Sequence, residues 1–329
     1  GAAAHSDHGR CVAEVFLSAA RKETEAYKIK DTVKLVAVAK ALEVATTVEV
    51  DGEVQDRDMD EIALETAEKA IAEWGKPSGE LLYLKRAPEA LYEKWKKAGV
   101  LPRNIDREIV EIMHRTHMGV DQDYKNLMKQ GARASLADGW GGSMMATETS
   151  DVLFGTPVPL TSQVNLAVLK ADQVNIILHG HNPVLSEMIV NAVMDKDAVV
   201  KAKAVGASGI NLAGMCCTGN ELLMRRKIPI AGNMLNQELA IMTGAVEAMV
   251  VDYQCIFPAI SDLAGCFHTR VISTAAKAKF PGAVHMEFEP HSARETAAAI
   301  VEQAIENFPN RKKDRLCIPD HPADWTAGF

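Results

Sequence analysis

The 329-residue sequence lacks the features that mark membrane, secreted and nucleic-acid-binding proteins. It has no apolar run of the roughly 18 residues that a membrane span needs, and no charged region precedes a secretory hydrophobic segment. It also has no long basic run, and its formal net charge is -8, which argues against nucleic acid as a partner. We therefore expect a globular, cytoplasmic protein that binds neither membrane nor nucleic acid.

Cysteine is scarce, so only a few positions can act as thiol ligands, nucleophiles or disulfide partners. Six cysteines in 329 residues are too few for a disulfide framework. In a reducing compartment such cysteines are metal ligands, reactive thiols or small buried residues. The Gly-x-Gly-x-x-Gly fingerprint is also absent, so a dinucleotide site has little support.

The pattern of apolar residues changes near residue 170. Residues 1–170 have a helical pattern, interrupted at 46–59 by a polar, acidic stretch that we interpret as a turn or surface insertion. From 171 to 329 strands and helices alternate, which favours a parallel, Rossmann-like sheet. We thus predict a multidomain chain, with a helical domain at 1–170 and an α/β domain at 171–329. Strands are expected at 173–178, 208–214, 228–232, 247–253, 269–274 and 283–288, and helices at 183–204, 219–226, 236–246, 258–266 and 291–307.

Three of the expected strands end on residues that bind soft metals. The run at 173–178 leads into His179-Gly180-His181, the run at 209–215 into Cys216-Cys217, and the run at 248–254 into Cys255. Continuous apolar runs are typical of parallel strands buried on both faces, and ligands bind at the carboxyl edge of such sheets. Imidazole and thiolate groups at one edge suit a transition metal or an iron-sulfur cluster.

Local helix signals favour His181 and Cys217 over their neighbours. His181 precedes Asn182-Pro183, a good N-cap followed by a residue suited to the first helical position. Cys217 precedes Thr218 and Glu221, which fit a capping box with Thr218 as the N-cap. Cys217 would then lie at a helix amino end, where the partial positive charge lowers the thiol pKa.

The other cysteines are open to a plainer interpretation, since free cysteines are commonly small buried residues. For Cys216 the buried and the ligand interpretations are equally supported. Cys255 follows an apolar strand, which favours a ligand, whereas Cys266 and Cys317 show no such placement.

Three patterns in residues 1–170 also bear on function. His5, His8 and Cys11 recur every third residue and form either a proton path or an exposed polar helix face. Glu111 and His114 match the Glu-x-x-His spacing of di-iron helices, but such sites need two copies and we find one. The glycine-rich segment 137–144 is either a tight interhelical turn or a place of close backbone approach.

Several long motifs, in the same order, resemble those of the anaerobic nickel-iron carbon monoxide dehydrogenases, and the similarity covers nearly the whole chain. They include His179-Gly180-His181 with the residues to 187. The others lie at 1–10, 113–121, 137–143, 214–221 and 251–255.

The resemblance implies a Ni-4Fe-4S cluster that oxidises CO reversibly with water to CO2, two protons and two electrons. It implies that His181 and Cys217 bind the iron outside the cubane part of the cluster, and that Cys255 holds one cubane iron. Relatives pass electrons through further 4Fe-4S clusters, for which we identify no ligands in this sequence.

The resemblance also implies roles in proton transfer. His5 matches the family's active-site histidine, an acid or base in the reaction, and His8 continues a proton relay. Cys11 stands where many relatives have a further histidine, which implies a shortened or rerouted relay. Asp138 would orient a histidine, as carboxylates do around metal sites.

Relatives carry an amino-terminal cluster segment and a further α/β domain, so we expect a fragment made of the rear of the helical domain and the middle α/β domain. The implied partners are the remainder of the subunit, a ferredoxin-like electron acceptor, a second copy in a homodimer, and acetyl-CoA synthase. Two alternatives remain: a hybrid-cluster protein that reduces hydroxylamine, against which the segment 216–220 argues, and a non-catalytic metal-binding scaffold.

Overall fold

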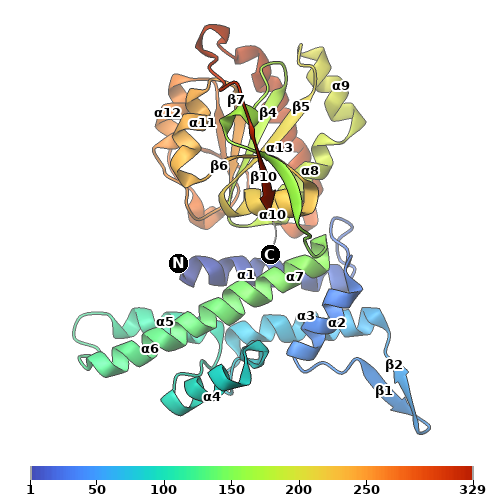
Figure 1. The fold of residues 1–329 in the computed structure, drawn as a ribbon, viewed down its shortest axis with the longest axis vertical. Helices are drawn as coiled ribbons and strands as arrows, with labels where there is room; N and C mark the ends of the chain where they lie inside the picture. The colour runs from blue at the N-terminus through green and yellow to red at the C-terminus, as the bar shows by residue number, and fades with distance from the viewer. Residues whose placement is uncertain (1, 328–329) are drawn as a thin grey trace. The chain divides into compact units, whose positions relative to one another are not determined.

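The computed structural model describes residues 2–327, and the chain divides into two compact units, Gly1–Thr156 and Pro157–Phe329. The sequence placed the division at 170, later than the structure does. The cause is strand β3 (Leu160–Val164), which the sequence did not predict and which pairs with the sheet of the second unit. Both units are shown in Figure 1.

The first unit is helical, as predicted, apart from one exposed hairpin. Strands β1 (Thr47–Val50) and β2 (Glu53–Asp56) pair around Asp51-Gly52, which confirms the predicted turn. Asp31, Asp58, Asn104 and Asp123 cap helices by accepting backbone N–H groups. The helices are α1 (Ala2–Ala20), α2 (Thr32–Ala41), α3 (Met59–Gly75), α4 (Glu89–Ala98), α5 (Ile105–Arg115), α6 (Tyr124–Leu136) and α7 (Ala146–Phe154).

The glycine-rich segment is a π-helix, Ala137–Met145, between α6 and α7. Figure 1 shows α6 and α7 as one long rod through it, so the interpretation as a tight turn is wrong. Close backbone approach is confirmed: a Cβ on Gly142 would lie 3.1 Å from the backbone of His5. Because π-helical turns are concentrated at functional sites, this contact marks the segment near His5 as a candidate functional region.

The second unit is the predicted parallel α/β sheet. Its strand order is β10-β3-β6-β5-β4-β7-β8-β9, and only β10 runs antiparallel, to β3. Every residue of the central strands β4 and β7 is buried, as expected for strands covered on both faces. The strands not yet given bounds are β4 (Val174–Gly180), β5 (Ile210–Met215), β6 (Ile230–Gly232), β7 (Val246–Val251), β8 (Arg270–Ser273), β9 (Val284–His285) and β10 (Ala323–Ala327).

Helices cover both faces of this sheet, with α11 and α12 on the side opposite α8 and α9 (Figure 1). The predicted helix 183–204 is two helices, because Asp195 caps the second one. The helix expected at 236–246 ends at Met242, shortly before Gly244 with its positive φ of 65°. The helices are α8 (Pro183–Val193), α9 (Lys196–Ala204), α10 (Cys216–Arg226), α11 (Gln237–Met242), α12 (Ile260–Cys266) and α13 (Ala293–Asn307).

An ion-pair network on α5 predicts the acid sensitivity of the first unit. Glu111 pairs with Arg103 and, at 2.6 Å, with Arg115. Burial acts to raise the pKa of Glu111, but hydrogen bonds from the two arginines outweigh it and lower the pKa to about 2. Because this value lies below the ordinary 4.5, Glu111 stabilises the fold above about pH 4.5, and that contribution is lost as the pH falls towards about 2.

Glu111→Gln should therefore flatten the loss of stability in this acid range. The measurement is the free energy of unfolding in urea as a function of pH, with the exposed Glu93→Gln as the control. If the acid limb of Glu111→Gln is as steep as that of the control, the network does not carry this pH dependence.

Candidate metal centre

Three segments meet at the carboxyl edge of the sheet, as the sequence predicts. β4 lies between β5 and β7, so the residues that follow these strands are neighbours. Gly180, at the end of β4, forms a parallel bridge with Cys216, the first residue of α10. Cys255 is close enough to Cys216 and Cys217 for its negative charge to raise the pKa of both thiols. The edge thus gathers three cysteines next to His181.

The backbone is strained at these cysteines. Among the described residues, Cys216 has a φ of 57°, Gln254 of 71° and Cys255 of 62°. Residues other than glycine seldom adopt this left-handed conformation, and strained positions concentrate at functional sites. Of these, Cys255 is a candidate ligand and Cys216 directly precedes another, Cys217, so the strain lies at or next to candidate ligands.

Asp252, directly after β7, links the segments. Its carboxylate accepts hydrogen bonds from the backbone N–H of His181 (2.6 Å), Asn182 (3.1 Å) and Tyr253 (2.5 Å), and from the hydroxyl of Thr218 (2.9 Å). Burial raises the pKa of Asp252 to about 7, and the hydrogen bonds, which favour the ionised form, offset this only in part. The sequence did not single out Asp252, although an acidic residue ending an apolar strand was a usable signal.

Gly180 has to be a glycine because of Asp252. Its φ is 134°, and a Cβ on it would lie 1.9 Å from Oδ1 of Asp252. We expect Gly180→Ala to lower the free energy of unfolding by about 3 kcal/mol through backbone strain and overpacking. Urea denaturation measures this, with Gly209→Ala as the control, since a Cβ there meets only one atom, at 3.9 Å. Equal stability of the two variants would contradict the packing described for Gly180.

The predicted capping box at α10 is wrong. The helix begins at Cys216 with Met215 as its N-cap and no side-chain cap. Thr218 lies in the first turn and donates to Asp252, and Glu221 pairs with Arg225. The helix starts earlier because Cys216, directly after β5, adopts a left-handed backbone conformation that turns the chain from the strand into the helix.

Cys217 does lie in the first turn of α10, but its pKa is not lowered as predicted. Burial, followed by the charges of Cys255 and Asp252, raises the pKa of Cys217. Burial likewise raises the pKa of Cys216 to about 12. The desolvation of the thiols and the neighbouring negative charges outweigh the effect of the helix end.

The two histidines at the end of β4 differ in environment, since His179 lies in the strand and His181 follows it. His179 is buried, its Nε2 lies 3.3 Å from Oε1 of Gln237, and burial lowers its pKa to about 4. His179 is therefore neutral and lies inside the fold. His181 is half-buried and lies directly beyond the end of the strand.

The candidate catalytic residues lie in the first unit, and the structure brings two of them together. Nδ1 of His5, on α1, lies 2.9 Å from Oδ1 of Asp138, in the π-helix. His8 is buried, while His5 and Cys11 are half-buried. The alternative that this stripe is an exposed polar face is therefore wrong, because α1 turns it inward.

The ligand chemistry fits part of a cluster better than a single ion. Within residues 2–327, no three histidine, cysteine or acidic side chains are arranged to hold one metal ion. His181, Cys217 and Cys255 lie at one edge of the sheet, and imidazole and thiolate groups are the ligand types of an iron-sulfur cluster. Glu111 is engaged by two arginines, so the di-iron interpretation of Glu111 and His114 has no support.

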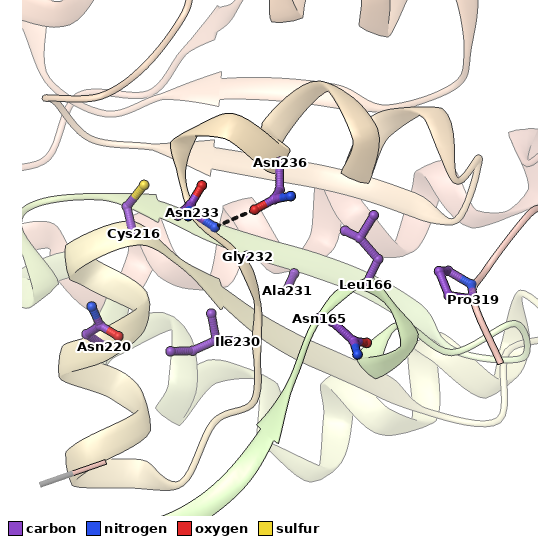
Figure 2. Close-up of a pocket in the computed structure, with 10 residues that line it drawn as sticks. All are labelled: Asn165, Leu166, Cys216, Asn220, Ile230, Ala231, Gly232, Asn233, Asn236 and Pro319. Carbon is purple, nitrogen blue, oxygen red and sulfur yellow. Dashed lines mark hydrogen bonds between the residues drawn. The ribbon is translucent and has the colours of Figure 1, made fainter. Parts of the chain in front are cut away.

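A cavity of about 600 Å³ adjoins this edge and was not predicted. Four asparagines and Cys216 contribute to its wall, and Figure 2 shows the backbone N–H of Asn233 hydrogen-bonded to Oδ1 of Asn236, at 3.1 Å. The cluster of asparagines after β6 was a signal in the sequence. The lining residues are Asn165, Leu166, Cys216, Asn220, Ile230, Ala231, Gly232, Asn233, Asn236 and Pro319.

A serine, a histidine and a glutamate form a second group of hydrogen-bonded side chains, on β8, on β9 and just after β9. Ser273 Oγ lies 2.9 Å from Nδ1 of His285, whose Nε2 lies 2.6 Å from Oε2 of Glu287. The order matches that of hydrolase triads, but Ser273 is only 1% exposed, so its hydroxyl is closed to a substrate. The contacts instead tie β9 to β8.

Comparisons with known proteins identify the family. The model of the Prismane/CO dehydrogenase family matches residues 1–318, and the chain belongs to this family. It is 52% identical to carbon monoxide dehydrogenase 1 of Methanosarcina mazei and 45% identical to carbon monoxide dehydrogenase 1 of Carboxydothermus hydrogenoformans. Each match covers 100% of this chain and 51% of the relative, so the chain spans about half the length of these curated relatives.

Solved structures agree with this assignment. The Ni-free carbon monoxide dehydrogenase of Thermococcus sp. AM4 is 54% identical, with a TM-score of 0.94 over 100% of this chain and 51% of that chain. A structure of acetyl-CoA synthase/carbon monoxide dehydrogenase with NiZn- and NiNi-Fe4S4 clusters is 43% identical, with a TM-score of 0.92 over 100% and 48%. The resemblance seen in the sequence is thus confirmed, and these relatives favour it over the hybrid-cluster alternative.

None of the helices within residues 2–327 combines the length and the apolar composition that a membrane span requires.

Proposed function

We propose that the chain is part of the catalytic subunit of an anaerobic carbon monoxide dehydrogenase, which converts CO and water into CO2, two protons and two electrons, reversibly. The observation that carries the proposal is the gathering of His181, Cys217 and Cys255 at one sheet edge in a chain of this family. Strained backbone at Cys255 and at Cys216, next to Cys217, supports a functional edge.

In this proposal the three residues hold part of a Ni-4Fe-4S cluster. His181 and Cys217 bind the iron outside the cubane part, and Cys255 binds a cubane iron. When bound, the cluster supplies a nickel site for CO and a Lewis-acidic iron for water. Because three ligands do not enclose such a cluster, the other ligands come from the remainder of the subunit.

We further propose that His5 is the acid or base of the reaction. Its contact with Asp138 orients the ring through Nδ1, and imidazole is the side chain that exchanges protons near neutral pH. His8, three residues further along the same face of α1, would continue the proton relay inside the helical unit.

The proposed partners follow from the same assignment. They are a ferredoxin-like electron acceptor, a second copy in a homodimer, and acetyl-CoA synthase, which is named with carbon monoxide dehydrogenase in one similar structure. The proposed location is the cytoplasm.

The test is CO-dependent reduction of a viologen by the anaerobically prepared subunit loaded with iron, sulfide and nickel. His5→Asn should lower the rate by about 10²–10⁴-fold as a lost acid or base, and Asp138→Asn by about 10–100-fold. Iron content should not change in either variant. The exposed Asp56→Asn is the control.

Two results would contradict the proposal. Unchanged rates in both variants would remove His5 and Asp138 from the reaction. A folded protein that holds no iron and reduces no viologen would favour the alternative of a non-catalytic scaffold.

A further inference from the structure

The carboxylate of Asp252 is shared by all three segments that meet at the sheet edge. Its Oδ1 accepts from the backbone N–H of His181 and Tyr253, and its Oδ2 accepts from Asn182 and from the hydroxyl of Thr218. One side chain thus binds the start of α8, the first turn of α10 and its own segment after β7.

Each of the four donors is a candidate ligand or lies within two residues of one. His181 itself donates its backbone N–H, and Thr218 directly follows Cys217. Asp252 lies three residues before Cys255 on the same strained segment. A shift of the Asp252 carboxylate would therefore move the backbone at His181 and Cys217 together.

Close packing and further hydrogen bonds surround the carboxylate of Asp252. A Cβ on Gly180 would overlap it at 1.9 Å, and Thr218 is fully buried. The backbone N–H of Asp252 donates to the carbonyl of His179 at 3.2 Å, and Nδ2 of Asn182 donates to the hydroxyl of Tyr253 at 3.1 Å. The carboxylate is fixed by packing on one side and by four donors on the other.

The chemistry of the four contacts calls for a carboxylate. All four partners are donors, and an ionised carboxylate has only acceptor sites. An asparagine of the same shape would turn an NH2 group towards at least one donor, which leaves a buried polar group without an acceptor.

We propose that Asp252 is the positioning residue that sets the separation of His181 and Cys217 for metal binding. The inference rests on the proposed function, because it assigns these two residues as ligands. It adds that the spacing of the ligands is determined by a residue that does not touch the metal.

Two readouts on the intact chain test this role. The first is amide hydrogen exchange of the metal-free chain at His181 and Asn182, which reports the bonds to Asp252 directly. The second is the affinity for ferrous iron, titrated anaerobically in the presence of sulfide. The variants are Asp252→Asn, Thr218→Val, which removes a single bond, and Thr218→Ser, which keeps the hydroxyl. The exposed Asp262→Asn is the matched control.

Asp252→Asn should raise exchange at His181 and Asn182 by about tenfold or more and weaken iron binding by about 10–100-fold, the usual effect of a residue that orients metal ligands. Thr218→Val should weaken iron binding by several-fold, and Thr218→Ser should restore it. Thr218→Val keeps the shape of the side chain and should fold. Its affinity for iron therefore still tests the role of Asp252 if Asp252→Asn does not fold.

Failure of this inference differs from failure of the proposed function. If the wild-type chain takes up iron and both Asp252→Asn and Thr218→Val take it up equally well, Asp252 is not a positioning residue. If the wild-type chain takes up no iron, the metal site itself is wrong, and the role of Asp252 at it falls with it.

Discussion

Arg311→Met should lower the free energy of unfolding of the second unit by about 3–5 kcal/mol, the usual effect of removing one partner of a buried ion pair. Arg311 is buried and binds the fully buried Glu247 through Nε at 2.8 Å and through a second nitrogen at 2.7 Å. It also donates to the carbonyls of Ala171 (2.6 Å), Gln173 (2.7 Å) and Ala245 (2.9 Å). Methionine would leave these three carbonyls without this donor and the Glu247 carboxylate without its arginine partner.

Urea denaturation followed by circular dichroism measures this loss, with the exposed Lys313→Met as the control. The double variant Glu247→Gln/Arg311→Met should recover part of the loss, because it leaves no charge buried. If Arg311→Met is as stable as Lys313→Met, the C-terminal segment is not anchored through Arg311.

Cys217→Ala should lower the amount of iron that the reconstituted chain retains by at least about tenfold, because the thiolate supplies a metal bond that alanine cannot replace. His181→Ala and Cys255→Ala should act in the same direction. Cys216→Ala should retain iron, since Cys216 faces the asparagine-lined cavity (Figure 2).

The exposed cysteines provide matched controls for this experiment. Cys266→Ala and Cys317→Ala remove thiols that are open to solvent and away from the sheet edge. They should bind iron as the wild-type chain does. If they lose as much iron as Cys217→Ala, the chain binds iron through any available thiol, and the proposed ligand set is wrong.

The sequence predicts the centre of the sheet well because burial on both faces leaves continuous apolar runs. β4 and β7 are fully buried, and both were expected within a few residues of their actual bounds. Since parallel strands end at one edge, the meeting of His181, Cys217 and Cys255 followed from the strands alone. The division of the chain into helical and α/β parts followed from the same periodicity.

The edges and ends were not predictable in this way. β3 and β10 are short and partly exposed. They pair although they lie far apart in the sequence, so no local sequence pattern predicts the pairing. The π-helix places Asp138 beside His5 through a contact 133 residues apart. The start of α10 and the raised pKa of Cys217 depend on neighbours from other strands, which spacing along the chain does not reveal.

The metal content of the anaerobically purified, folded subunit tests the central claim most directly. The account predicts nickel together with several irons per subunit. A folded subunit that carries neither nickel nor iron, before and after anaerobic reconstitution with iron, sulfide and nickel, would contradict it.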